Sequence, residues 1–106
     1  MTSNRLQQLK QMLQDSPDDA FLLFALAKEY EKQGQEEEAL AFYQKLKQQH
    51  PDYVGLYYHL GKWHERQEEW ESAVSTYREG LDVAQAQQHR DAAAELRAAL
   101  DNLEDW

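Results

Sequence analysis

The sequence contains no cysteine, and among its 106 residues only four are glycine and two are proline. Without cysteine the chain can form neither disulfide bonds nor the thiolate nucleophiles and thiolate zinc sites that depend on this residue. Because glycine and proline are scarce, few positions interrupt regular secondary structure. Apolar residues between these positions follow a helical spacing throughout, so we expect an all-α protein.

Long apolar runs are also absent. Residues 1–9 contain no apolar stretch of the length that a signal peptide needs, and no segment approaches the ~18–20 apolar residues of a membrane-spanning helix. From these absences we expect a soluble, cytoplasmic protein.

The chain is strongly acidic. It has 20 Asp and Glu residues against 11 Lys and Arg residues, which gives a formal net charge of −9 at pH 7. Such a chain is repelled at long range by the phosphates of nucleic acids and by anionic membrane surfaces. We therefore expect no nucleic acid and no membrane as its main partner.

Motifs for catalysis are missing too. There is no glycine-rich phosphate loop, nucleophile elbow, His-Glu-x-x-His pair or calcium loop with alternating Asp residues. Of the four histidines, His50 and His89 fall at loop or helix ends. His59 and His64 are five positions apart and so do not share a helix face as metal ligands at i and i+4 would. We predict no catalytic residue, no metal site, no cofactor and no enzyme activity.

Residue types recur at a separation of 34 positions. The matching pairs are Pro17 and Pro51, Leu26 and Leu60, Ala27 and Gly61, Ala39 and Ala73, Leu40 and Val74, and Tyr43 and Tyr77. A period in this range is typical of repeat proteins, in which each unit buries its apolar face against the next copy. The same register relates Leu6 and Leu9 to Leu40 and Tyr43, so the first helix resembles the second half of a repeat.

Turn and capping residues divide the pattern into six helices. We expect hairpin turns near Gly34, a left-handed C-cap, and near Glu68, where no glycine is present. Asp15 or Ser16 is predicted to cap the second helix, with Pro17 in its first turn, and Asp52 to cap the fourth. The acidic residues 36–38 favour the start of the third helix through its dipole. Because Gln85 replaces the proline of the earlier repeat, the fifth helix is expected to be longer by about one turn.

The pattern resembles the tetratricopeptide repeat, a 34-residue helix–turn–helix unit with large, small and aromatic residues at fixed places. In 20–53 the matching residues are Leu23, Leu26, Ala27, Tyr30, Gly34, Ala39, Tyr43, Leu46 and Pro51. In 54–87 they are Tyr57, Leu60, Gly61, Ala73, Tyr77 and Gly80, with departures at His64, Glu68 and Gln85. His64 replaces Tyr30 of the first repeat and is expected to pack between the helices.

The resemblance implies a right-handed superhelical array of antiparallel helix hairpins. We expect one domain over 1–106, composed of an orphan helix at 3–15, repeats at 20–53 and 54–87, and a capping helix at 90–104. A terminal cap of this kind covers the apolar end of a repeat array.

The resemblance also implies a concave groove lined by the first helix of each repeat. The predicted groove residues are Phe21, Phe24, Lys28, Lys32, Tyr58, His59, Lys62 and Arg66. The four cations can equally be ordinary solvated charges, partly neutralised by Glu31 and Glu65. Some members of the family clamp a chaperone's C-terminal carboxylate, but Phe24, Lys28 and His59 depart from that clamp, so chaperone binding is not expected.

We therefore expect a small protein-binding adaptor whose groove prefers a peptide that combines acidic and apolar side chains. The alternative comes from a different class of function. In it the chain is a structural self-association module, and its orphan or capping helix packs against a second copy to form a homodimer.

Overall fold

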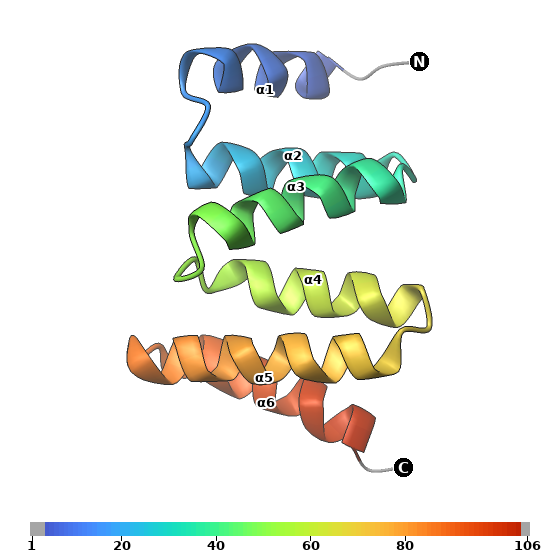
Figure 1. The fold of residues 1–106 in the computed structure, drawn as a ribbon, viewed down its shortest axis with the longest axis vertical. Helices are drawn as coiled ribbons and strands as arrows, with labels where there is room; N and C mark the ends of the chain where they lie inside the picture. Colours follow the sequence, from blue (N-terminus) through green and yellow to red (C-terminus); the bar gives the residue numbers. More distant parts are fainter. Residues whose placement is uncertain (1–3, 105–106) are drawn as a thin grey trace. The chain divides into compact units, whose positions relative to one another are not determined.

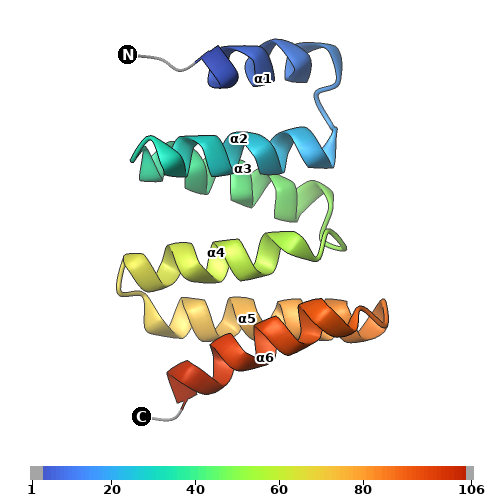
Figure 2. The same cartoon turned by 180° about the vertical axis from the view of Figure 1, so that it is seen from behind.

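The computed structural model describes residues 4–104, which form helices and no strands. The helices are α1 (Asn4–Asp15), α2 (Ala20–Lys32), α3 (Glu36–Gln49), α4 (Gly55–Arg66), α5 (Trp70–Ala86) and α6 (Arg90–Glu104). Figures 1 and 2 show that successive helices form antiparallel hairpins, with α2 beside α3 and α4 beside α5. The all-α architecture of helix hairpins expected from the sequence is thus confirmed.

Two compact units divide the chain between Tyr53 and Val54. The first contains α1, α2 and α3, and the second contains α4, α5 and α6. The assignment of 1–106 to one domain with an orphan helix, two repeats and a cap stays a prediction.

Helix ends follow one pattern at three places. Gly34 has a φ of +76°, and Glu68 and Gln88 have φ values of 59° and 56°, all in the left-handed region. The amide of the next residue then donates back into the helix: Gln35 N–H to Tyr30 O at 2.9 Å, Glu69 N–H to His64 O at 2.9 Å, and His89 N–H to Ala84 O at 2.8 Å. This arrangement satisfies carbonyls in the last turn that the helix itself leaves open.

Helix starts differ from the sequence prediction. The residue that caps α2 is Asp19, whose carboxylate accepts a 3.0 Å hydrogen bond from the Leu22 amide. Pro17 therefore lies in the preceding turn and not in the first turn of the helix, and neither Asp15 nor Ser16 is the cap. At α4 the cap position is Val54, without a side-chain hydrogen bond, and Asp52 lies in the turn before it. Additional residues in each loop move the start of the helix beyond the predicted cap.

The first unit is held by buried small and aromatic residues. Ala27, Ala39 and Tyr43 have no exposed surface, and Leu6 and Leu9 of α1 are buried where α1 packs against α2. Small side chains at such places allow helix backbones to approach closely.

Polar contacts also join α1 to α2. Arg5 Nε lies 3.7 Å from Oε2 of Glu29, a carboxylate that is nearly buried and that also accepts a 3.4 Å hydrogen bond from Gln33 Nε2. Lys10 Nζ lies 5.7 Å from the centre of the Tyr30 ring, within cation–π range. These contacts fix one face of α1 against α2.

The second unit depends on two glycines in helix interiors. A Cβ added to Gly61 of α4 would overlap the ring of Tyr77 on α5, and one added to Gly80 would overlap Tyr57 of α4. The Cβ at Gly80 would also lie 3.2 Å from the side chain of Leu96 on α6. Both glycines are buried, so the Tyr77 ring and the base of the Tyr57 side chain lie directly against helix backbone.

Helix α5 has 17 residues, three more than the 14 of α3, as the absence of a proline at Gln85 predicted. Over residues 4–104, none of the helices combines the length and the apolar character that crossing a membrane requires.

Replacing Gly61 by Leu is predicted to destabilise the protein by ~1–3 kcal/mol, because Tyr77 would have to leave its place on α4. Ala27→Leu, at a fully buried position in the other unit, should have a similar effect. Lys62→Ala, at a partly exposed site, should cost less than about 1 kcal/mol. Equal melting temperatures for Gly61→Leu and Lys62→Ala would contradict this packing of Tyr77 on Gly61.

Replacing Glu68 by Gly is predicted to stabilise the protein by about 1 kcal/mol, since a side chain is disfavoured in the left-handed conformation of this turn. Gln88→Gly should act in the same direction and Gly34→Ala in the opposite one. Thermal unfolding provides the measurement, and a lower melting temperature for Glu68→Gly would be inconsistent with the observed turn.

Candidate functional site

The predicted groove residues of the first unit lie on one face of α2. Phe21 is 61% exposed, an unusually large fraction for a phenylalanine, and Lys28 and Lys32 are exposed one and two turns beyond Phe24. Phe24 itself is half-buried, with its ring centre 5.4 Å from that of Tyr53. Phe24 therefore contributes mainly to packing within the unit, and Phe21 is the aromatic side chain that α2 exposes to a partner.

In the second unit the predicted residues lie on α4, where Tyr58 occupies the position equivalent to Phe24 and Gly55 the position equivalent to Phe21. Tyr58 and His59 are half-buried, and their rings meet edge to face with centres 5.5 Å apart. Lys62 Nζ lies 5.4 Å from the centre of the Tyr58 ring, and Arg66 is exposed one turn further along. The α4 face thus combines an aromatic pair with two cations, one of which lies over an aromatic ring.

Behind each face lies a cluster of three side chains, of which the sequence predicted the pairing of lysine with glutamate but not the contact with a tyrosine. In the first unit the Tyr43 hydroxyl donates a hydrogen bond to Oε1 of Glu31, and Lys28 Nζ lies 3.9 Å from the same oxygen. In the second unit the Tyr77 hydroxyl donates to Oε2 of Glu65, and Lys62 Nζ lies 3.4 Å from that oxygen. We call these the Tyr–Glu–Lys clusters. Each residue of the first cluster lies 34 positions before its counterpart in the second, so both units form the same cluster.

The clusters set the charge that each face presents. Lys28 and Lys62 pair with carboxylates of their own helices, so part of their positive charge is neutralised before any partner binds. The tyrosine hydroxyl holds the carboxylate in place, which limits its freedom to move with the lysine. An acidic group of a partner must therefore compete with Glu31 and Glu65 for Lys28 and Lys62.

The same geometry controls the ionisation of Tyr77. Burial raises the pKa of its phenol well above the usual value, and the hydrogen bond to Glu65 and the negative charge of that carboxylate raise the pKa further. Tyr77 is consequently neutral in the folded protein and acts as a hydrogen-bond donor.

The signal for these clusters was present in the sequence as a spacing. Glu31 and Tyr43 are 12 residues apart, and Glu65 and Tyr77 repeat that separation one period later. Because the apolar pattern assigns both tyrosines to the core, it predicts them as packing residues and assigns no partner to their hydroxyl groups.

The histidines make local structural contacts. His64 Nδ1 lies 2.7 Å from Glu69 Oε1 across the α4–α5 turn, and its ring meets Trp63 edge to face. His50 Nε2 lies 2.6 Å from the carbonyl oxygen of Asp18, and His89 Nδ1 accepts a 3.2 Å hydrogen bond from an amide in the first turn of α6. Within the part of the chain that the structure describes, no three side chains of His, Asp or Glu form a group suited to a metal ion.

Tyr77→Phe is predicted to cost about 1–2 kcal/mol near neutral pH, because it removes a hydrogen bond to a charged group. Because folding raises the pKa of Tyr77, this residue contributes to the free energy of unfolding. The contribution is fully present below about pH 10, the pKa of an unperturbed tyrosine, and is lost as the pH rises further. Urea unfolding between about pH 8 and 11 should therefore show the difference between wild type and Tyr77→Phe shrinking at alkaline pH. Parallel pH profiles for the two proteins would contradict the assignment.

Comparison with known proteins identifies the family. Models of the tetratricopeptide repeat match residues 6–60 and 56–91. A tetratricopeptide repeat domain protein from Salinibacter ruber is 39% identical over 82% of this chain and 97% of its own, with a TM-score of 0.78. A protein from Bordetella parapertussis is 27% identical over 97% of this chain and 89% of its own, with a TM-score of 0.81. Among curated proteins the sequence finds no match.

A more distant structure agrees in fold alone. The tetratricopeptide repeat domain of Sgt2 from Aspergillus fumigatus is 18% identical over 94% of this chain and 64% of its own, with a TM-score of 0.79. Two repeat models that together match most of the described residues, and a relative with 39% identity, lead to one conclusion. The chain belongs to the tetratricopeptide repeat family.

Proposed function

We propose that the chain is a small adaptor that binds a segment of a partner protein through the exposed faces of α2 and α4. Tetratricopeptide repeats are generally protein–protein interaction modules and are typically not catalytic. The proposed contact residues are Phe21, Phe24, Lys28, Lys32, Tyr58, His59, Lys62 and Arg66.

The observation that best supports this proposal is the repetition of one surface chemistry in both units. The α2 face offers Phe21 with two exposed lysines, and the α4 face offers Tyr58 with Lys62 and Arg66. A protein with a net charge of −9 has few cations to place, yet these four recur at the same positions of successive repeats. Aromatic side chains and arginine are enriched at protein interfaces.

This chemistry favours a partner segment that combines acidic and apolar side chains. Within either unit, an apolar group of the segment can cover Phe21 or Tyr58, while its carboxylates pair with the basic side chains of the same helix. Binding should be of modest affinity, because part of the charge on Lys28 and Lys62 is already neutralised by Glu31 and Glu65. Exposed ion pairs are also screened beyond ~8 Å at physiological ionic strength, so binding should weaken with added salt.

Self-association through the terminal helices is the second candidate. Met12 is 52% exposed, which leaves an apolar side chain accessible on α1, a helix that packs mainly against α2. A monomer whose mass in light scattering is independent of concentration would exclude this alternative.

The test compares charge removal on the two faces with charge removal elsewhere. Lys28→Gln with Lys62→Gln should weaken binding of synthetic peptides that combine Glu with Leu or Phe by on the order of tenfold, the effect of losing two exposed ion pairs. Glutamine is preferable to glutamate at these positions, because a new carboxylate would repel Glu31 and Glu65.

The matched control is Arg90→Gln with Arg97→Gln, which removes the same charge from exposed positions on α6. Fluorescence anisotropy at several salt concentrations provides the affinity, and circular dichroism verifies the fold. Equal weakening in both variants, or in neither, would contradict the assignment of the α2 and α4 faces.

A further inference from the structure

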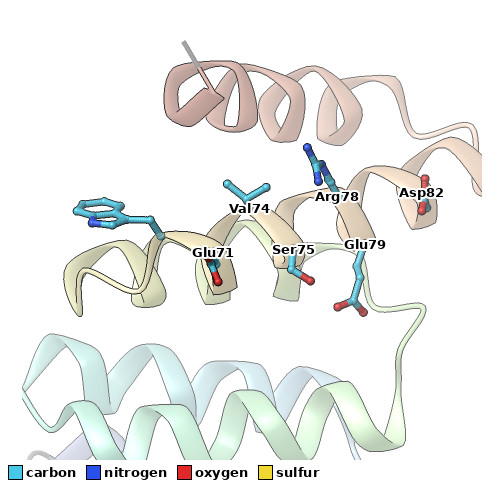
Figure 3. Close-up of a pocket in the computed structure, with 7 residues that line it drawn as sticks. Glu71, Val74, Ser75, Arg78, Glu79 and Asp82 are labelled. Carbon is cyan, nitrogen blue, oxygen red and sulfur yellow. The ribbon is translucent and has the colours of Figure 1, made fainter. Parts of the chain in front are cut away.

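The outer face of α5 has a chemistry unlike that of α2 and α4. The buried residues of α5, Ala73, Thr76, Tyr77, Gly80, Leu81 and Ala84, occupy one side of the helix. On the opposite side lies an open hollow of about 470 Å³ whose lining includes Trp70, Glu71, Val74, Glu79 and Asp82. Figure 3 shows Glu71 and Glu79 directed to one side of this helix, with Val74 and Arg78 on the other.

Trp70 is the largest apolar residue of this face. It is 52% exposed at the first position of α5, and Val74, one turn later, is half-buried. In the preceding repeat the equivalent position is occupied by Glu36, so the helix hairpin does not require an aromatic side chain there. Tryptophan is enriched among the residues that contribute most of the binding energy at protein interfaces.

The charges around Trp70 are negative. Glu71, Glu79 and Asp82 are all exposed, whereas the one cation of the face, Arg78, is bound by Glu104 of α6. The lining of the hollow therefore contains more carboxylates than cations, with the apolar side chain of Trp70 at one end.

We propose that this face of α5 is a second docking surface, for a basic amphipathic helix of a partner protein. The charge complementarity is both local and global, because the three carboxylates attract Lys and Arg side chains and the net charge of −9 attracts a basic segment from a distance. An apolar residue of the segment covers Trp70 and Val74. The proposal is independent of the function assigned to α2 and α4, whose faces favour acidic segments.

The spacing defines the partner further. From Trp70 to Asp82 the face extends by twelve residues, or about 18 Å at the helical rise per residue. A partner helix of three to four turns spans this length, with an apolar and a basic residue near the end that meets Trp70 and Glu71, and basic residues near the end that meets Glu79 and Asp82. A second copy of the chain is a poorer occupant, since two copies of charge −9 repel each other and this face is acidic.

The experiment uses the full chain and synthetic helical peptides. One peptide carries Leu with Lys and Arg on a single face, and a matched peptide carries Leu with Glu. The variant Glu71→Gln, Glu79→Gln, Asp82→Asn removes the three carboxylates with little change of shape, and Trp70→Ala removes the largest apolar side chain. The control Asp18→Asn, Glu95→Gln, Asp101→Asn removes the same charge at exposed positions outside this face.

The expected result is saturable binding of the basic peptide, with NMR amide shifts concentrated between residues 70 and 82. The α5 variants should weaken that binding by about tenfold, and the control by less than about threefold. Equal weakening by the α5 and control variants would show a general charge effect and overturn the proposal. Amide shifts confined to α2 and α4, or stronger binding of the acidic peptide at α5, would also overturn the proposal. Amide shifts in α5 that appear when the chain alone is concentrated would overturn it in favour of a second copy as the occupant.

Discussion

The packing of the second unit depends on the close contact between a tyrosine side chain and the backbone of the neighbouring helix at a glycine. Tyr77 of α5 occupies the space that a Cβ at Gly61 would need, and Tyr57 has the same relation to Gly80. Because interiors are packed as densely as crystals, such a contact leaves no room for a shift of one helix along the other. The register of α4 against α5 is thereby fixed, and with it the positions of the side chains on their outer faces.

The same tyrosine links packing to surface charge. Its ring lies on Gly61, its hydroxyl binds Glu65, and Glu65 pairs with Lys62 on the exposed face. The first unit repeats the polar half of this chain of contacts with Tyr43, Glu31 and Lys28. In both units, therefore, a change in core packing should alter the position of a carboxylate that neutralises a surface lysine. This coupling is a property of the repeat and not of one site.

The sequence predicted those features that depend on residue type along one helix. Helical periodicity gave the six helices, Gly34 indicated a left-handed turn, and Gln85 predicted the longer α5. It did not single out Asp19 as a cap, because Asp15, Ser16 and Asp19 are all of the type that caps helices. It did not predict the partners of the tyrosine hydroxyl groups, because these contacts join different helices and form only after the chain has folded. Apolar spacing shows that a tyrosine is buried but not which carboxylate its hydroxyl meets.

The same limit applies to the candidate surfaces. The pattern of residues 34 positions apart indicated the cations of α2 and α4, since they recur in both repeats. It gave no signal for the outer face of α5, where Trp70 has no aromatic counterpart at Glu36. It also grouped Phe24 with Phe21, although the ring of Phe24 packs against Tyr53 within its own unit. The difference between Glu36 and Trp70 is visible in the sequence, but the exposure of Trp70 is known only from the folded structure.

The central claim is that Tyr77 joins the buried backbone at Gly61 to the carboxylate of Glu65. A nuclear Overhauser spectrum of the full chain in water tests it most directly. The account predicts contacts between the Tyr77 ring protons and the Hα protons of Gly61, together with a hydroxyl proton of Tyr77 that exchanges slowly enough to be observed. A Tyr77 ring without contacts to Gly61, or a hydroxyl proton in rapid exchange with water, would contradict it.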